Sequence, residues 1–280
     1  MPAASNTLGQ RLRWWRERRG LSQLDLAGVA GTSQRHLSFV ESGRTAPSRE
    51  MVLRLAAALD VPLREQNALL LAAGYAPAWR ESDLAAPALA QVSGALTHML
   101  AQQEPYPAFV VDRRWNLLRA NDGAGRLTQF LLGPARQDSP ATPPSDPPAR
   151  VNLAEALLAP DVLRPHVVNW PEVALHFLRS VQSDAMIDGT PETAALLARL
   201  QAYPDVPDLA QLPAEAQAPV LVMHIRKDAT ALRLFTTIAT LGTPQDVTVQ
   251  EIRIESFFPA DEATARIFKD WARAGAQGND

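Results

Sequence analysis

The chain has 280 residues, 23 of them proline and none cysteine, and its formal charge at pH 7 is −3. The lack of cysteine excludes disulfides, thiolate zinc sites and iron–sulfur centres. No apolar run approaches the length of a membrane span, and the first residues show neither the charged nor the apolar region of a secretory signal. These features predict a cytoplasmic protein without a membrane anchor, long enough for two domains.

The charge is unevenly distributed along the chain. Residues 1–80 contain 11 Arg and 6 Asp or Glu, a balance of +5, so residues 81–280 carry −8. A basic N-terminal module on an acidic body is typical of a DNA-binding head joined to a part that must not bind DNA.

The first 75 residues predict five helices. Apolar periodicity, capping serines and threonines, and turn glycines mark their ends. The expected helices are Leu8–Arg19, Gln23–Ala30, a third that follows Thr32 or Ser33, one from Ser48 through Leu59, and one from Pro62 to just before Gly74.

The second and third of these helices are joined by a tight turn. Gly31 lies where the chain must reverse, and glycine alone takes a left-handed backbone there without penalty. In the third helix the buried positions are Leu37 and Val40, so its other face is free. This is the layout of a helix-turn-helix, whose second helix lies in the major groove of duplex DNA.

A connection and a further helix follow the head. The segment from Gly74 to Ser82 contains Tyr75, Pro77 and Trp79 and is too short and stiff for a floppy tether. Apolar residues then form a stripe along a helix from Ala88 to Gln103, which either fixes the head to the body or forms a dimer seam. The stripe consists of Leu89, Val92, Leu96, Met99 and Leu100.

The remaining chain alternates strands and helices in an α+β pattern. A strand pair comes first, then helices, then three antiparallel strands, which is the order of a PAS-like sensor domain. Six prolines between Gly133 and Arg150 predict a loop. The expected strands are Phe109–Val111, Trp115–Ala120, Val220–Arg226, Leu232–Thr240 and Val247–Phe258; the expected helices are Asn121–Leu132, Asn152–Leu158, Glu172–Ser183 and Pro191–Ala202.

From residue 8 to about 73 the chain resembles the XRE/Cro-like DNA-binding domains. The positions that carry this resemblance are Gln23, Ala27, Gly31, Leu37, Val40, Glu41 and Gly43. The resemblance implies that Arg16 and Glu41 form an internal salt bridge. It assigns base reading in double-stranded operator DNA to Ser33, Gln34, Arg35, Ser38 and Phe39, and phosphate contacts to Gln23, Ser42 and Arg44. Phe39 departs from the polar residue often found there, so packing is its alternative role.

Most of the chain also resembles the MmyB-like transcription regulators. The motifs are residues 35–49, 69–77, 107–112 with Trp115-Asn and Ala120-Asn, 151–153, and 169–174. This resemblance implies a small, apolar or fatty-acid-like effector held between the sheet and its covering helices. The candidate pocket residues are Phe109, Trp115, Asn121, Trp170, Phe177, Met223 and Phe235; each has core packing, or for Asn121 helix capping, as its alternative.

No catalytic arrangement stands out in the sequence. The histidines lack metal-ligand spacing, and phosphate loops and nucleophile elbows are missing, so neither an enzyme nor a cofactor is expected. We therefore expect a regulator with a helix-turn-helix domain at 1–75, a linker and connecting helix at 76–104, and a PAS-like domain at 105–275 with a proline-rich loop at 133–150. A homodimer would read two half-sites. The alternative is a second domain that only dimerises or binds proteins.

Overall fold

A computed structural model describes residues 7–133, 151–207 and 220–277. The chain divides into two compact units, which are described separately below. The first comprises Met1–Asp83 with the short segments Asp188–Pro191 and Thr243–Gln250, and the second comprises the rest. The predicted proline-rich loop lies outside the described residues, apart from Gly133.

Between residues 7 and 83 the chain forms five α-helices, which confirms the all-α head. Side chains of Thr7, Ser22, Ser33 and Ser48 each accept a backbone N–H at the start of a helix, as their capping propensity predicts. The helices are α1 (Leu8–Arg18), α2 (Gln23–Val29), α3 (Gln34–Glu41), α4 (Arg49–Ala58) and α5 (Leu63–Ala72).

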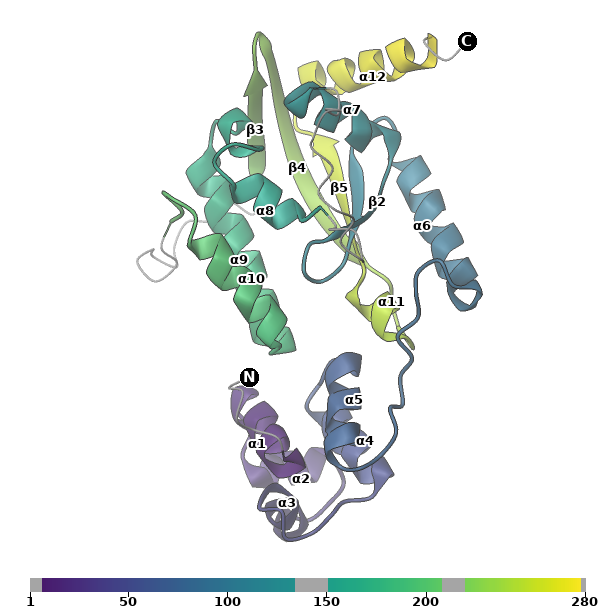
Figure 1. Cartoon of the computed structure of the whole chain (residues 1–280), viewed down its shortest axis with the longest axis vertical. Helices are drawn as coiled ribbons and strands as arrows, with labels where there is room; N and C mark the ends of the chain where they lie inside the picture. Colours follow the sequence, from purple (N-terminus) through teal and green to yellow (C-terminus); the bar gives the residue numbers. More distant parts are fainter. Residues whose placement is uncertain (1–6, 134–150, 208–219, 278–280) are drawn as a thin grey trace, which may run out of the picture. The chain divides into compact units, whose positions relative to one another are not determined.

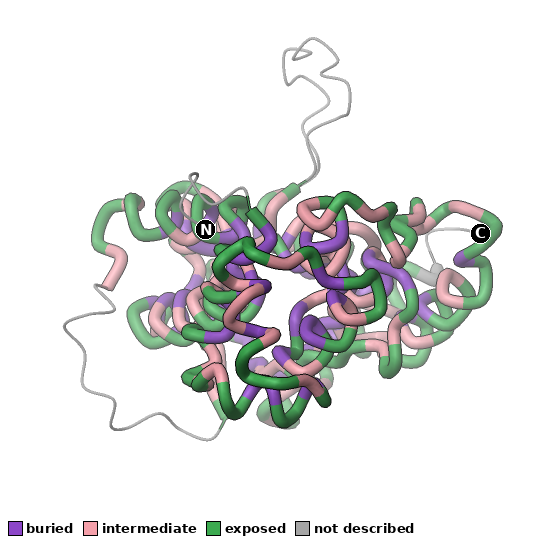
Figure 2. The backbone as a smooth tube through the Cα atoms, turned by 90° about the horizontal axis from the view of Figure 1, so that it is seen from below, coloured by how far each residue is buried: buried purple, intermediate pink, exposed green. Residues whose placement is uncertain are grey.

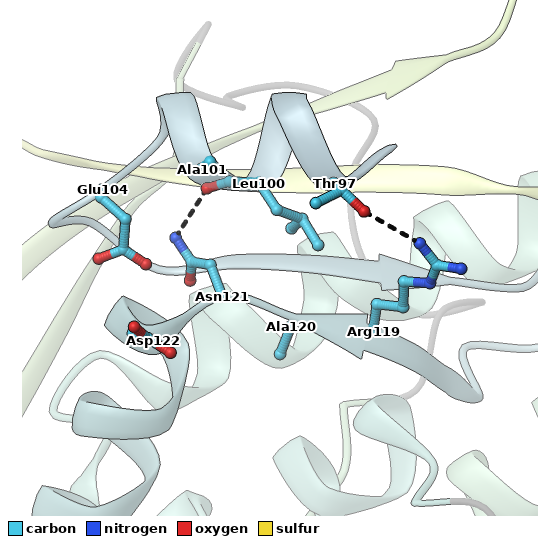
Figure 3. A pocket seen from close by; sticks show the side chains of 8 residues that line it. All are labelled: Thr97, Leu100, Ala101, Glu104, Arg119, Ala120, Asn121 and Asp122. Atoms are coloured by element: carbon cyan, nitrogen blue, oxygen red, sulfur yellow. Dashed lines mark hydrogen bonds between the residues drawn. The ribbon is translucent and has the colours of Figure 1, made fainter. Parts of the chain in front are cut away.

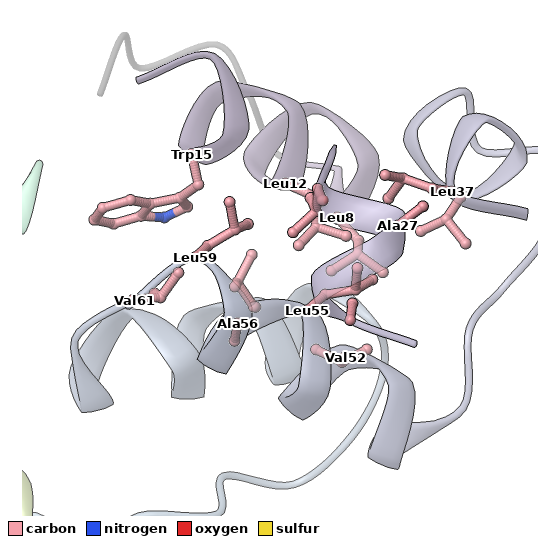
Figure 4. Close-up of a cluster of buried hydrophobic side chains, with 14 of the residues drawn as sticks. Leu8, Leu12, Trp15, Ala27, Leu37, Val52, Leu55, Ala56, Leu59 and Val61 are labelled. Carbon is pink, nitrogen blue, oxygen red and sulfur yellow. The ribbon is translucent and has the colours of Figure 1, made fainter. Parts of the chain in front are cut away.

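One apolar core holds these five helices together (Figure 4). Trp15 and Leu12 of α1 are fully buried against residues from the other four helices. Gly9 allows α1 to approach the end of α3 closely, because a β-carbon there would lie 2.4 Å from the carbonyl oxygen of Glu41. Gly31 has a φ of +62°, as the turn between α2 and α3 requires.

The second unit is built on one antiparallel sheet of five strands, which confirms the predicted α+β class (Figure 1). The strand order is β2-β1-β5-β4-β3, so the N-terminal hairpin joins the three C-terminal strands through β1 and β5. The strands are β1 (Ala108–Val111), β2 (Leu117–Ala120), β3 (Val222–Lys227), β4 (Thr230–Thr240) and β5 (Arg253–Pro259).

Helices cover both faces of this sheet. One face packs against α6 (Ala90–Gln102) through Ala108, Val110 and Ile254. The opposite face carries Phe109 and Met223, which contact two further apolar clusters at once. Those clusters contain α7 (Asp122–Leu132), α8 (Leu153–Leu158), α9 (Trp170–Asp188), α10 (Pro191–Gln201) and α12 (Glu262–Gln277). Figure 2 shows that buried, intermediate and exposed residues are interspersed along the described backbone.

One prediction about this part of the chain was wrong. Val247–Phe258 is not one strand: Val247–Glu251 forms the short helix α11, and β5 begins at Arg253. Of the two roles left open for the apolar stripe of α6, the structure disfavours the dimer seam, because Leu96 and Leu100 are buried against the unit's own sheet. An apolar pattern shows that a face is covered but does not show what covers it.

No helix within the described ranges is both long enough and apolar enough to cross a membrane.

Candidate functional site

The first candidate site is the free face of α3. Ser33 caps this helix by accepting the backbone N–H of His36 at 3.1 Å. Leu37 and Val40 are buried in the core, whereas Gln34 and Arg35 are exposed in the first turn. The helix is therefore anchored by its inner face and presents two long polar side chains at its N-terminal end.

A buried ion pair fixes α3 to α1, which confirms the predicted pair. Arg16 donates two hydrogen bonds to the Glu41 carboxylate, at 2.7 and 3.0 Å, and a third to the carbonyl oxygen of Leu21. The hydrogen bond to Glu41 raises the pKa of Arg16 above its ordinary value. Gln23 of α2 donates to the same carboxylate at 3.0 Å, so one carboxylate connects three helices. Because the pair is charge-assisted and bidentate, it sets the orientation of α3 as well as its position.

Two arginines flank the ring of Phe39. The guanidinium carbons of Arg35 and Arg44 lie 5.4 and 5.9 Å from the ring centroid, within the range of cation–π contacts. The half-buried ring thus contacts one cation from the first turn of α3 and one from beyond its C-terminal end. Of the other predicted DNA contacts, Ser33 and Ser42 are exposed, and Gln23 and Ser38 are half-buried.

The second candidate site is the apolar interior of the second unit. Trp115, Trp170 and Phe177 belong to one cluster, in which the Trp115 and Phe177 ring centroids lie 4.4 Å apart. Phe109 and Met223 pack against the same cluster from the sheet. Five of the seven predicted pocket residues therefore come together on one face of the sheet.

The other two predicted pocket residues lie elsewhere. Phe235 alternates with the buried Leu234 along β4 and stacks on Phe258, so it faces the opposite side of the sheet. The Asn121 side chain makes hydrogen bonds to the backbone that stabilise the fold. Its Oδ1 accepts from the backbone N–H groups of Ala124 and Ala108, and its Nδ2 donates to the carbonyls of Tyr106 and Leu100.

Asn121 instead borders a pocket of about 440 Å³ between α6 and the edge strand β2 (Figure 3). The polar groups around this pocket already bind one another. Arg119 donates to Ser93 and Thr97, and Glu104 pairs with Arg126. Desolvating them for a ligand would break existing hydrogen bonds, which disfavours this pocket as a ligand site.

Sequence reasoning missed one buried acid. Glu255 lies within the strand expected at Val247–Phe258 and is buried beside Phe109 and Ile238, on the face that carries the clusters. Burial raises the pKa of Glu255 to about 7, against the lowering effect of a hydrogen bond with Thr236. The sequence did not indicate that Glu255 is buried, because helices cover both faces of the sheet and a polar residue on either face can be buried.

Within the three described ranges, no group of three or more His, Cys, Asp or Glu side chains suits a metal ion.

Two family models match the chain, one in each of the two parts that hold these sites. The helix-turn-helix model matches residues 12–66, and the model of the MmyB-like transcription regulator ligand binding domain matches residues 92–270. The second match covers more than half of the chain, so the protein belongs to the family with the MmyB-like transcription regulator ligand binding domain. A helix-turn-helix DNA-binding domain followed by this domain makes it a transcription regulator; neither family is a family of enzymes.

Similarities to solved structures are limited. The restriction-modification controller protein C.AhdI from Aeromonas hydrophila is 42% identical over 21% of this chain and 89% of that chain, with a TM-score of 0.21. An RNA-binding light-oxygen-voltage receptor is 14% identical over 96% of this chain and 63% of that chain, with a TM-score of 0.26. Neither superposition supports an argument about the fold. No curated protein matches the chain.

Proposed function

We propose that this regulator reads a specific DNA operator with the N-terminal end of α3 and that a small, mainly apolar molecule, fatty-acid-like in character, binds within its second unit. The observation that supports operator reading is the exposed pair Gln34 and Arg35 on a helix that the buried Arg16–Glu41 pair holds rigidly. Arginine pairs bidentately with guanine and glutamine with adenine, so these two side chains suit base reading in the major groove.

The remaining proposed DNA contacts fall into two groups, those beside the base-reading side chains and those with the phosphate backbone. Ser33, Ser38 and Phe39 flank the two base readers, whereas Gln23, Ser42 and Arg44 contact phosphates. Phosphate contacts set the register of the protein on the duplex, and base contacts specify the sequence. Selection from a pool of random duplexes tests this proposal, since one enriched motif is expected. Equal recovery of all sequences would contradict operator reading.

For the ligand, the supporting observation is the apolar cluster between the sheet and its covering helices. Its aromatic and aliphatic side chains form the kind of lining that apolar ligands need. Comparing the intact mass of the natively purified chain with that of the denatured chain tests this. A bound small molecule is expected as a mass difference. Repeated purification without one, and without binding of added decanoic acid, would favour a second unit that only mediates protein contacts.

We also propose that the regulator acts as a homodimer, because a single head buries too little DNA surface for high specificity. Two heads would read half-sites about one helical turn apart. The contacts must come from surfaces other than the α6 stripe, which the unit's own sheet covers. Light scattering should give a dimer at tens of micromolar, free or on DNA. A monomer in both states would rule it out.

A further inference from the structure

Two buried tryptophans in the second unit have no acceptor for their indole N–H groups. Trp115 is 1% exposed and Trp170 is 7% exposed, and both lie in the apolar cluster that lines the proposed ligand site. Among the described residues, neither Nε1 atom has a hydrogen-bond partner. A buried indole N–H normally finds a partner, because leaving it unpaired costs the free energy of a lost hydrogen bond.

The backbone of Trp115 adds a second, independent sign of function. Its φ is +65°, a left-handed conformation that bulky residues rarely adopt. The preceding turn enforces it, because the Asp112 carboxylate accepts the backbone N–H groups of Arg114 at 2.8 Å and Asn116 at 3.0 Å. The N–H of Leu153 then binds the Trp115 carbonyl at 2.9 Å. Strain of this kind is concentrated at ligand sites, where the surroundings hold a side chain in place.

An ion-paired arginine lies against the ring of Trp170. The Arg164 guanidinium lies 4.0 Å from the centroid of the Trp170 ring. Arg164 is held there by hydrogen bonds to the Pro204 carbonyl and to the exposed carboxylate of Asp205. An indole N–H can only donate, so it binds an oxygen that carries a free lone pair and cannot bind an ammonium group, which has none.

We infer that Trp115 and Trp170 bind the polar end of the ligand through their indole N–H groups. The ligand is then an apolar molecule whose uncharged or anionic oxygen accepts these hydrogen bonds, while its apolar part lies among side chains such as Phe109, Phe177 and Met223. An alkylammonium end is disfavoured, because it offers no acceptor for the two N–H groups. This inference rests on the proposed ligand binding and names the chemistry that the site selects.

Indole resonances of the whole chain labelled with ¹⁵N-tryptophan test this directly. The probes are decanoic acid, 1-decanol and decylamine, which share one apolar tail and differ in the end group. Trp115→Phe and Trp170→Phe identify the two resonances, and each removes an N–H while keeping an aromatic ring. Trp79→Phe is the control, because the Trp79 indole already donates to Gln66 in the head at 2.8 Å.

We expect decanoic acid and 1-decanol to move the Trp115 and Trp170 indole protons downfield, and decylamine to bind more weakly than either. Trp115→Phe or Trp170→Phe should weaken decanoic acid binding about three- to tenfold, and Trp79→Phe should leave it unchanged. Binding with unmoved indole resonances and unchanged affinity in both variants would overturn the inference but keep the proposed function. If no probe binds while DNA binding persists, the proposed apolar ligand fails and this inference fails with it. Circular dichroism of each variant separates lost binding from lost folding.

Discussion

The two arginines that flank Phe39 have similar surroundings and different expected roles. Arg35 lies in the first turn of α3, and Arg44 follows the helix after the turn at Gly43. A side chain at the start of a recognition helix reaches base edges, whereas one beyond its end reaches the phosphate backbone. Their shared contact with the Phe39 ring makes them a matched pair, since truncating either removes one cation–π contact.

We therefore predict that Arg35→Ala costs about 1–3 kcal/mol of binding free energy at the selected operator and relaxes the preference at one base pair. Arg44→Ala should weaken binding evenly on all sequences and lower the salt dependence by about one phosphate contact. Fluorescence anisotropy with operator and scrambled duplexes measures both. An equal loss on both duplexes for Arg35→Ala would refute its base-reading role.

Buried Glu255 predicts a pH-dependent stability. Burial raises its pKa from 4.5 to about 7, so between these values the folded chain keeps a proton that the unfolded chain releases. The free energy of unfolding contributed by this group therefore falls as pH rises through that window and stays low above it. Ionisation of Glu255 penalises the folded state at neutral and alkaline pH.

Glu255→Gln should remove this dependence, because the amide keeps the shape and a hydrogen-bonding group without a charge. We expect the variant to gain up to about 3 kcal/mol over the wild-type chain at pH 8 and little at pH 5. Urea unfolding at several pH values measures the difference. Glu262→Gln, at an exposed position in α12, is the control. Parallel pH profiles for the wild-type chain and Glu255→Gln would show that Glu255 does not titrate in this window.

At the scale of elements, α3 depends on the residue that caps its N-terminus, Ser33. The helix has only eight residues, and Ser33 supplies its side-chain cap. An isolated helix of this length is only marginally stable. The order of α3 therefore comes from the cap, the core contacts of Leu37 and Val40, and the Arg16–Glu41 pair. Ser33 is also proposed to lie near the bases, so its substitution affects two properties at once.

Ser33→Ala should destabilise α3 by about 1 kcal/mol through loss of the cap, seen as roughly fivefold faster amide hydrogen exchange in this helix. Ser33→Asn restores a good capping residue and should restore protection. Comparing the DNA affinity of the two variants separates helix order from direct contact. Unchanged exchange in Ser33→Ala would mean that tertiary packing alone holds the start of α3.

At the scale of the molecule, the connection that leaves the head is fixed to α5. The Asn67 side chain accepts the backbone N–H groups of Ala78 and Trp79 and donates to the Trp79 carbonyl at 2.7 Å. The Trp79 indole donates to Gln66, and the Tyr75 hydroxyl to the Pro47 carbonyl. The segment is thus an ordered extension of the head, as its composition predicted.

Replacing residues 76–82 with a longer Gly/Ser linker should preserve operator binding and abolish its response to decanoic acid. A ligand changes DNA affinity only if it binds two arrangements of the protein with different affinities, typically with about 1–3 kcal/mol of coupling. With a flexible tether, the position of the heads no longer depends on which arrangement the second unit adopts. Asn67→Ala loosens the segment without lengthening it and should give a partial loss. Anisotropy with and without decanoic acid measures the coupling, and a full response with the Gly/Ser linker would refute this route.

The sequence by itself determined the head almost completely. Caps, turn glycines and 3.6-residue periodicity are local signals, and they predicted five helices and a cap of α3 at Thr32 or Ser33, of which the structure shows Ser33. Family resemblance predicted the Arg16–Glu41 pair. In the second unit the same local logic identified most strands and helices. Of the seven candidate pocket residues, Trp115, Trp170, Phe177, Phe109 and Met223 lie together, and Phe235 and Asn121 do not.

Only the tertiary structure decided which face each strand residue occupies. The alternation of side chains along a strand assigns residues to two faces, but it does not show which face is more deeply covered. In this sheet helices cover both faces. For that reason Phe235 lies away from the apolar cluster, Glu255 is buried, and the α6 stripe packs on its own sheet. The unpartnered indoles were equally invisible, because hydrogen-bond satisfaction depends on neighbours distant in sequence.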